Sequence, residues 1–162
     1  MLITIVGKRG KGKTSLAKKI IRSKSSSKIF IFDFMGEYSD LSNKDLSIYY
    51  YDPWRFCKEV WDQAGLYENN LVVFDEINRY GHNNEDIHWL YDLGRHKNID
   101  IIAVSRRIFS DLPVFVRTGT ERYIFFQITE PIELDYIKKH SSEEMTERVR
   151  NLGFLEYVIL DL

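Results

Sequence analysis

The sequence has 162 residues, 44% of them hydrophobic, which is enough for a single domain (residues 1–162) with a substantial core. Its 23 basic and 24 acidic residues give a net charge of −1, which excludes a uniformly basic surface, so any polyanion site must be local or formed by several copies. Cys57 is the only cysteine, which excludes an intrachain disulfide and a thiolate metal cluster and points to a reducing compartment.

The chain begins with a short apolar run, residues 2–6, that ends at a glycine-rich segment. This run is too short for a signal peptide, and no later run approaches the roughly 18 apolar residues of a membrane span. We therefore expect a cytoplasmic protein without membrane insertion.

Five apolar runs rich in β-branched and aromatic residues predict strands. They are residues 2–6, 28–34, 71–76, 99–105 and 122–128. Most are continuous rather than alternating in hydrophobicity, which is typical of parallel strands covered on both faces. Residues 48–52 are interpreted as either a short edge strand or a loop, and the final FLEYVILDL predicts an additional strand.

Amphipathic segments between these runs predict helices. They cover residues 13–24, 54–64, 85–97, 111–118 and 131–139, with Pro131 suited to a first helical turn. Ser141 and Glu144 have the spacing of a capping box, which predicts a short helix towards Arg150. SKSSSK (23–28) is interpreted as a solvated turn. This alternation predicts an α/β fold with a mainly parallel central sheet and helices on both faces.

The segment GKRGKGKT (7–14) matches the phosphate-loop pattern G-x-x-x-x-G-K-S/T without a mismatch. Its glycines let backbone N–H groups surround phosphate oxygens, and the following helix N-terminus adds partial positive charge. Lys13 can reach the β- and γ-phosphates, and the Thr14 hydroxyl can ligate Mg²⁺. The motif follows a predicted strand and opens a predicted helix, so we favour a nucleotide site over a chance basic turn. The expected nucleotide-binding residues are Gly7, Lys8, Arg9, Gly10, Lys11, Gly12, Lys13, Thr14 and Ser15.

The run LVVFDE ends in two adjacent carboxylates. Hydrolysis needs a carboxylate that holds the metal and a group that positions water. We assign Asp75 to the Mg²⁺ shell, with Thr14, and Glu76 to the general base. The other interpretation is a buried strand that ends in solvated carboxylates. A glutamate directly after the aspartate also predicts that another strand separates this strand from the phosphate-loop strand.

Two further polar positions are candidates for catalysis. Ser105 ends the strand IDIIAVS and could contact the γ-phosphate, or it could only satisfy local backbone. Arg95 ends the preceding helix and could reach a neighbouring subunit's nucleotide, because a guanidinium stays charged and binds phosphate bidentately. Its ordinary interpretation is a cation at a helix C-terminus. Arg117 and Arg122 are the alternatives for a trans arginine.

The order of these features resembles the HerA/FtsK superfamily of ring-forming DNA-translocating ATPases, which includes viral genome-packaging enzymes. IFIFDFMGEYSDL (29–41) is similar to the family's second strand with its Gly-Glu-Tyr turn, here Asp33, Gly36, Glu37 and Tyr38. LGRHKNIDIIAVSRRIFSDLP (93–113), RYIFFQITEPIELDYI and LGFLEYVILDL follow the family's later segments. The resemblance covers Gly7 to about Leu160. Ser105 stands where the family usually has glutamine, and Arg107 replaces an expected proline.

The resemblance implies a three-layer P-loop NTPase fold of the ASCE type, in which the Asp75 strand lies next to the Ser105 strand. It also implies ATP and Mg²⁺ as cofactors, a homo-oligomeric ring (hexamer or pentamer) and double-stranded DNA as partner. A viral member would also contact capsid or portal proteins and lie in the host cytoplasm or virion. Candidate DNA contacts are residues 79–86, where Arg79 could pair with a stacking Tyr80, and Arg106 with Arg107.

Two other functions remain open at this point. One is a small nucleoside or nucleotide kinase, in which Arg106, Arg107 and Arg117 would form a lid, although the Asp75–Glu76 pair fits it poorly. The other is a nucleotide-dependent assembly switch without motor activity.

Overall fold

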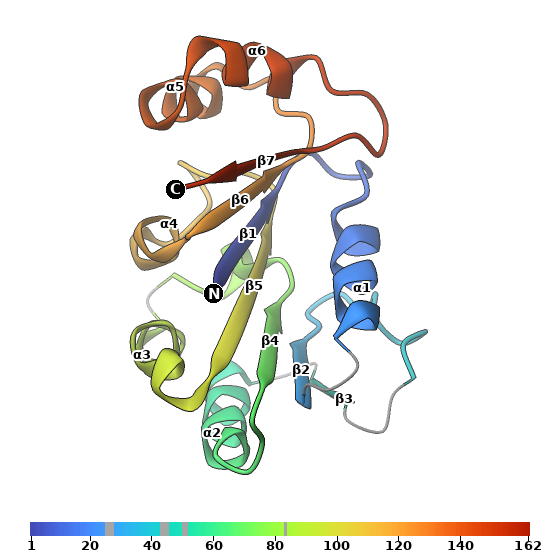
Figure 1. Ribbon diagram of the computed structural model, residues 1–162, viewed down its shortest axis with the longest axis vertical. Coiled ribbons are helices and arrows are strands. Elements are labelled where there is room, and N and C mark those ends of the chain that lie inside the picture. The colour runs from blue at the N-terminus through green and yellow to red at the C-terminus, as the bar shows by residue number, and fades with distance from the viewer. Residues whose placement is uncertain (25–27, 43–45, 50–51, 83) are drawn as a thin grey trace.

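The computed structural model describes residues 1–24, 28–42, 46–49, 52–82 and 84–162. One sheet runs through the molecule, with strands in the order β3-β2-β4-β5-β1-β6-β7 (Figure 1). The strands are β1 (Leu2–Val6), β2 (Lys28–Phe32), β3 (Leu46–Tyr49), β4 (Asn70–Phe74), β5 (Ile99–Ser105), β6 (Arg122–Phe125) and β7 (Val158–Asp161). All neighbours pair in parallel except β6 and β7, which are antiparallel.

Helices cover both faces of the sheet. They are α1 (Lys13–Ser23), α2 (Pro53–Ala64), α3 (Glu85–Leu93), α4 (Val114–Gly119), α5 (Pro131–His140) and α6 (Glu143–Arg150), with 3-10 turns η1 (Ile77–Arg79) and η2 (Gly94–Lys97). In Figure 1, α1 lies on one side of the sheet and α2, α3 and α4 lie on the other. The predicted fold class is therefore confirmed.

Two apolar layers explain this arrangement. Alternate residues of each strand point to opposite faces. On β2, Ile29 and Ile31 belong to the layer under α1, which contributes Ala17 and Ile21. Phe30 and Phe32 belong to the other layer, which α2 to α6 cover. Burial on both faces is the reason that the strands have continuous apolar sequences.

The strand order places β5 between β4 and β1, which confirms the predicted separation of the Asp75 strand from the phosphate-loop strand. Because β1, β2, β4 and β5 are parallel, their carboxyl ends share one edge of the sheet. The phosphate loop, the turn after Asp33, the Asp75–Glu76 pair and Ser105 therefore meet there. Ligands of open α/β sheets bind at this edge.

Several predicted strands and helices were wrong at their ends. The strands predicted over 28–34, 71–76 and 122–128 stop at Phe32, Phe74 and Phe125. The helix predicted from residue 111 begins at Val114, after Pro113, and the helix predicted over 85–97 becomes the 3-10 turn η2 at Gly94. Residues 46–49 form the edge strand β3. Parts of two predicted segments lie outside the described residues: residues 25–27 of the predicted turn, and residues 50 and 51 of the predicted edge strand or loop.

The predicted capping box at Ser141 was also wrong by one residue. Ser142 caps α6, because its hydroxyl accepts a hydrogen bond from the Met145 N–H at 3.1 Å. The Ser141 hydroxyl instead donates to the Ile137 carbonyl in the last turn of α5. Pro131 does occupy the first turn of α5, as predicted.

A buried carboxylate holds the loop after β5. Glu133 on α5 is fully buried and accepts hydrogen bonds from the backbone N–H groups of Ile108 and Phe109, at 2.7 and 2.9 Å. It also accepts from the Ser110 N–H and hydroxyl. This pairing satisfies a charge that would otherwise be costly to bury, and it fixes the loop that begins with Arg106 and Arg107.

None of the helices within the described ranges is both long and apolar enough to cross a bilayer.

Candidate active site

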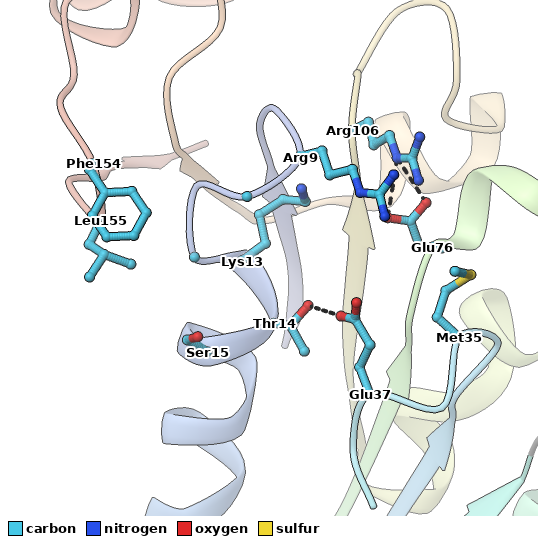
Figure 2. A pocket seen from close by; sticks show the side chains of 12 residues that line it. Arg9, Lys13, Thr14, Ser15, Met35, Glu37, Glu76, Arg106, Phe154 and Leu155 are labelled. Atoms are coloured by element: carbon cyan, nitrogen blue, oxygen red, sulfur yellow. Dashed lines mark hydrogen bonds and ion pairs between the residues drawn. The ribbon is translucent and has the colours of Figure 1, made fainter.

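The carboxyl edge of the sheet contains a cavity of about 310 Å³ beside the phosphate loop (Figure 2). Its lining comes from the loop, from the turn after β2, from the ends of β4 and β5, and from the segment before β7. The lining residues are Arg9, Gly10, Gly12, Lys13, Thr14, Ser15, Met35, Glu37, Glu76, Arg106, Phe154 and Leu155. The cavity therefore brings together residues that the sequence separates by more than a hundred positions.

Two glycines let the phosphate loop close against its surroundings. A Cβ at Gly7 would lie 2.5 Å from the Cβ of Phe126, which leaves no space for a side chain there. Gly12 has a φ of 107°, which L-residues rarely adopt, and it directly precedes the first residue of α1. The N–H groups at the start of α1 are thus exposed to the cavity without a side-chain cap.

Lys13 points across the loop. Its Nζ donates to the Lys8 carbonyl at 3.0 Å, and the side chain is almost completely buried. Burial lowers the pKa of Lys13, while the nearby Glu76 opposes this effect. A buried ammonium with one carbonyl partner is suited to bind phosphate oxygens, which would replace its lost hydration.

The other predicted loop residues have different positions. Arg9, Gly10 and Ser15 line the cavity, whereas the Lys8 ammonium donates to Thr129 on the far side of the loop. Lys11 is half-buried within the same loop.

The turn after β2 is built by a fully buried aspartate. Asp33 accepts hydrogen bonds from the Glu37 and Tyr38 N–H groups, both at 2.9 Å. The turn passes through Gly36 at a φ of 73°. It places the Glu37 carboxylate 2.8 Å from the Thr14 hydroxyl, which donates to it. The Gly-Glu-Tyr turn therefore connects β2 directly to the first turn of α1.

Asp75 is buried among other acidic groups. The Tyr38 hydroxyl donates to its Oδ1 at 3.4 Å, and the Tyr80 hydroxyl donates to its backbone carbonyl at 2.7 Å. Its Oδ2 is buried and has no hydrogen-bond partner among the described residues. Burial, together with the negative charges of Glu37 and Glu76, raises the pKa of Asp75 to about 7.

These features fit a divalent cation. Thr14, Glu37 and Asp75 offer oxygen atoms only, which Mg²⁺ prefers, and the orphaned Oδ2 of Asp75 would gain a partner. A positive ion would also offset the repulsion among the carboxylates.

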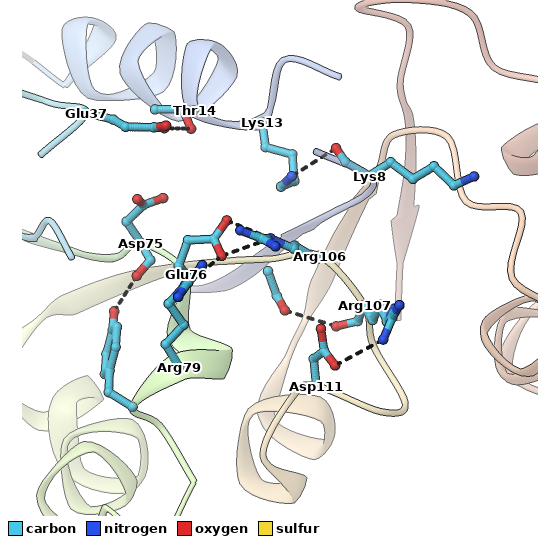
Figure 3. A network of polar contacts seen from close by, with 12 residues as sticks. Lys8, Lys13, Thr14, Glu37, Asp75, Glu76, Arg79, Arg106, Arg107 and Asp111 are labelled. Carbon is cyan, nitrogen blue, oxygen red and sulfur yellow. Dashed lines mark hydrogen bonds and ion pairs between the residues drawn. The ribbon is translucent and has the colours of Figure 1, made fainter. Parts of the chain in front are cut away.

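The Glu76 carboxylate faces the end of the Lys13 side chain that points away from α1, and it is paired with two arginines (Figure 3). Its carboxylate is 3.1 Å from the Nε of Arg106 and 3.4 Å from the Nε of Arg79. Its backbone has a φ of 49°, an uncommon conformation for a residue with a side chain. Backbone strain of this kind occurs at functional sites, where it aims a side chain.

Ser105 is buried at the end of β5, and its hydroxyl donates to the Arg107 carbonyl at 3.0 Å. In this structure it therefore makes the local backbone contact that was one of its two interpretations. Arg106, the next residue, is the one that faces the cavity and Glu76. Arg107 turns away from it towards Asp111, at 3.9 Å.

The three candidate trans arginines differ in their surroundings. Arg95 is exposed in η2, before β5, and thus lies at the opposite end of the strands from its own phosphate loop. Arg117 packs over the rings of Phe109 and Tyr136, and Arg122 is paired with Asp161 across β6 and β7. Within the described ranges, no ion pair engages Arg95. Its position excludes a role in its own site but not in a neighbour's.

Arg79 and Tyr80, predicted as a DNA-contacting pair, both have partners within the chain. The partly buried Tyr80 ring packs against Phe32, Phe34 and Phe74. Arg79 lies over the Phe34 ring and pairs with Glu76, so its charge is directed to the cavity region.

Comparison with known families identifies the class of protein. Residues 1–110 match the family of AAA domains, so the chain belongs to that family. The match includes the phosphate loop, the Gly-Glu-Tyr turn, the Asp75–Glu76 pair and β5. No curated protein sequence matches closely enough to add to this.

Solved structures agree with this fold at low sequence identity. The genome packaging NTPase B204 of Sulfolobus turreted icosahedral virus 2, bound to ATP-γS, matches with a TM-score of 0.79 and 22% identity over 99% of this chain and 91% of that one. The pCW3 conjugation coupling protein TcpA, in its monomer form with ATPγS, matches with a TM-score of 0.71 and 12% identity over 99% of this chain and 57% of that one. The fold implied by the resemblance to genome-packaging ATPases is thus confirmed.

Sequence reasoning missed several residues of the site region, among them Glu37, Phe154 and Glu133. Glu37 was predicted only as part of the family turn. Its position shortly after β2 was a signal that its carboxylate lies at the carboxyl edge of the sheet, near the end of β4. Phe154 was assigned to no site, because nothing local indicates that its segment folds back onto the phosphate loop. Glu133 resembled an ordinary first-turn acid of a helix.

Asp75→Asn should stabilise the protein, because it removes a buried carboxylate that lies among other acidic groups. In the folded state the pKa is about 7, above the value of about 3.9 for an unfolded aspartate, so the unfolded chain loses its proton first as pH rises. The stability contributed by this group therefore falls between about pH 4 and pH 7. The variant should gain several degrees in Tm over the wild type at pH 8 and little near pH 4, in thermal unfolding without nucleotide or Mg²⁺.

Asp135→Asn, on the exposed side of α5, is the matched control and should change Tm equally little at both pH values. A loss of stability in Asp75→Asn, or a gain that does not depend on pH, would show that the carboxylate is not held under repulsion.

Proposed function

We propose that this chain is the ATP-hydrolysing domain of a ring-forming motor that moves double-stranded DNA, with viral genome packaging as its setting. The observation that carries the proposal is the arrangement of Lys13, Thr14 and Glu76 around one cavity, with the buried Asp75 directly before Glu76, in a sheet where β5 separates β4 from β1. This arrangement places a carboxylate across the cavity from the phosphate-binding lysine.

The phosphate loop binds the triphosphate. Backbone N–H groups at the start of α1 donate to phosphate oxygens, and Lys13 neutralises the β- and γ-phosphates. Thr14 and Asp75, together with Glu37, would hold Mg²⁺, which when bound offsets the negative charge that develops during phosphoryl transfer. Asp33 and Tyr38 keep these oxygens in place through the hydrogen bonds of the turn after β2.

Glu76 accepts the proton of the attacking water. To do so its carboxylate must be available, whereas here it is paired with Arg106 and Arg79. A γ-phosphate beside Lys13 would offer Arg106 a stronger, doubly charged partner, because guanidinium groups bind phosphate bidentately. Binding of the triphosphate would thus release Glu76 and order the site for hydrolysis. A general base directly beside the proposed metal-binding aspartate favours transfer of the phosphoryl group to water rather than to a nucleoside.

Ring assembly and DNA movement are supported by less direct observations. Arg95 is exposed at the end of the sheet farthest from its own phosphate loop, where only a neighbouring copy could use it. B204 is described as a genome packaging NTPase and TcpA as a conjugation coupling protein. The net charge of −1 excludes a uniformly basic surface, so contact with DNA would depend on local basic loops, which ring assembly would gather.

Glu76→Gln should bind ATP with nearly unchanged affinity and release phosphate at least a hundredfold more slowly, because an amide cannot accept the proton. ATP affinity and single-turnover phosphate release measure the two effects. Glu144→Gln, exposed on α6, is the matched control and should hydrolyse ATP normally. Normal turnover in Glu76→Gln would disprove the assigned role.

Arg95→Ala tests the trans contribution. An Arg95→Ala subunit keeps its own Glu76, and a Glu76→Gln subunit keeps its own Arg95, so each variant alone should be inactive while a mixture of the two should regain activity. The reason is that a trans arginine stabilises transition-state charge in another subunit, so sites formed between the two variants would be complete. Arg148→Ala, also an exposed arginine, should be active alone, and its mixtures with Glu76→Gln should show activity only in proportion to its own share. No recovery of activity in the mixture of Arg95→Ala with Glu76→Gln would exclude a role in trans.

A further inference from the structure

The cavity has an apolar end that the phosphate chemistry does not use. Figure 2 shows Phe154 and Leu155 at one end, Glu76 and Arg106 at the other, and the phosphate loop between them. Both apolar residues belong to the segment that connects α6 to β7. A nucleotide consists of a charged triphosphate and a flat aromatic base, so the two ends match its two parts.

This segment is packed against the phosphate loop. A Cβ on Gly12 would lie 2.5 Å from Leu155 Cδ2, so the leucine side chain occupies the space next to that glycine. The Tyr157 ring lies against Phe126, with ring centroids 5.6 Å apart. The Gly153 N–H donates to the Glu156 carboxylate at 2.7 Å, which closes the segment into a tight turn. The apolar wall is therefore built onto the nucleotide site.

The exposure and backbone of these residues are unusual for a structural loop. Phe154 is 69% exposed and Leu155 is 52% exposed, although both are strongly apolar. Leu155 also has a φ of 63°, which is rare for a residue with a bulky side chain. Strain of this kind is kept where a side chain must be presented to a ligand. Leaving the Phe154 ring exposed forgoes a hydrophobic gain that a stacked base would recover.

The direction of a bound nucleotide follows from the charged groups. Lys13 receives the β- and γ-phosphates, and Glu76 with Arg106 faces the terminal phosphate. The α-phosphate, sugar and base must then extend in the other direction, past Thr14 and Ser15. Phe154 and Leu155 line the cavity on that side.

We propose that Phe154 and Leu155 form the base-binding wall of the site, with the nucleotide base stacked on the Phe154 ring and its edge against Leu155. The inference rests on the proposed function, since it assigns a subsite for the same nucleotide. Stacking on an aromatic ring recognises any base by its flat face. The segment before β7 thus completes a site whose phosphate-binding part lies at the beginning of the chain.

A comparison of ATP with inorganic tripolyphosphate separates this subsite from the phosphate site. Tripolyphosphate has the three phosphates but no base. Phe154→Ala should weaken ATP binding roughly tenfold and change tripolyphosphate binding less than about twofold, measured by calorimetry with Mg²⁺ present. Phe154→Trp should retain ATP affinity, and its fluorescence should be quenched by ATP but not by tripolyphosphate.

Leu66→Ala is the matched control, an exposed apolar residue in the turn before β4, and it should bind both ligands as the wild type does. Equal weakening of both ligands in Phe154→Ala, or unchanged ATP affinity, would overturn the base-binding wall while the proposed function stands. Failure of the wild type to bind either ligand would overturn the proposed function and the wall together.

Discussion

The parallel sheet forces four carboxylates to one edge, and the properties of the site depend on their repulsion. Asp33 and Glu37 follow β2, and Asp75 and Glu76 follow its neighbour β4, so they meet around the phosphate loop. Lys13 and the two arginines paired with Glu76 offset only part of this charge. The result is a buried aspartate with a pKa near 7 and an oxygen that has no hydrogen-bond partner among the described residues. A cation and the phosphates that bind it would complete such a site.

Each carboxylate has a different partner, which separates their roles. Each carboxylate oxygen of Asp33 accepts a hydrogen bond from a backbone N–H group, so Asp33 stabilises the turn after β2. Glu37 and Asp75 remain on the side of Thr14, where a metal would bind. Glu76 is directed to the far side of Lys13 by an unusual backbone conformation and is held there by arginine. Asp33 is thus structural, while the proposed function assigns metal binding to Glu37 and Asp75 and catalysis to Glu76.

Much of this site could be predicted from the sequence, because its motifs are local. The phosphate loop and the Asp75–Glu76 pair each lie at the end of a run whose burial on both faces is visible in its composition. What could not be predicted depends on side chains that meet through the fold. Tyr80 looked like a surface ring, but its hydroxyl donates to the Asp75 carbonyl and its partly buried ring packs against the core. Phe154 reaches the site only because β7 turns back antiparallel to β6.

In the proposed function, the nucleotide site lies within one chain except for an arginine, and Arg95 is exposed at the opposite end of the sheet. Assembly into a ring would join these two ends and gather the basic loops that act on DNA. The most direct measurement is phosphate release with and without double-stranded DNA, together with the particle mass in the presence of ATP. We expect a ring-sized particle whose phosphate release is stimulated by DNA. A monomer whose turnover is the same with and without DNA would contradict the proposed motor.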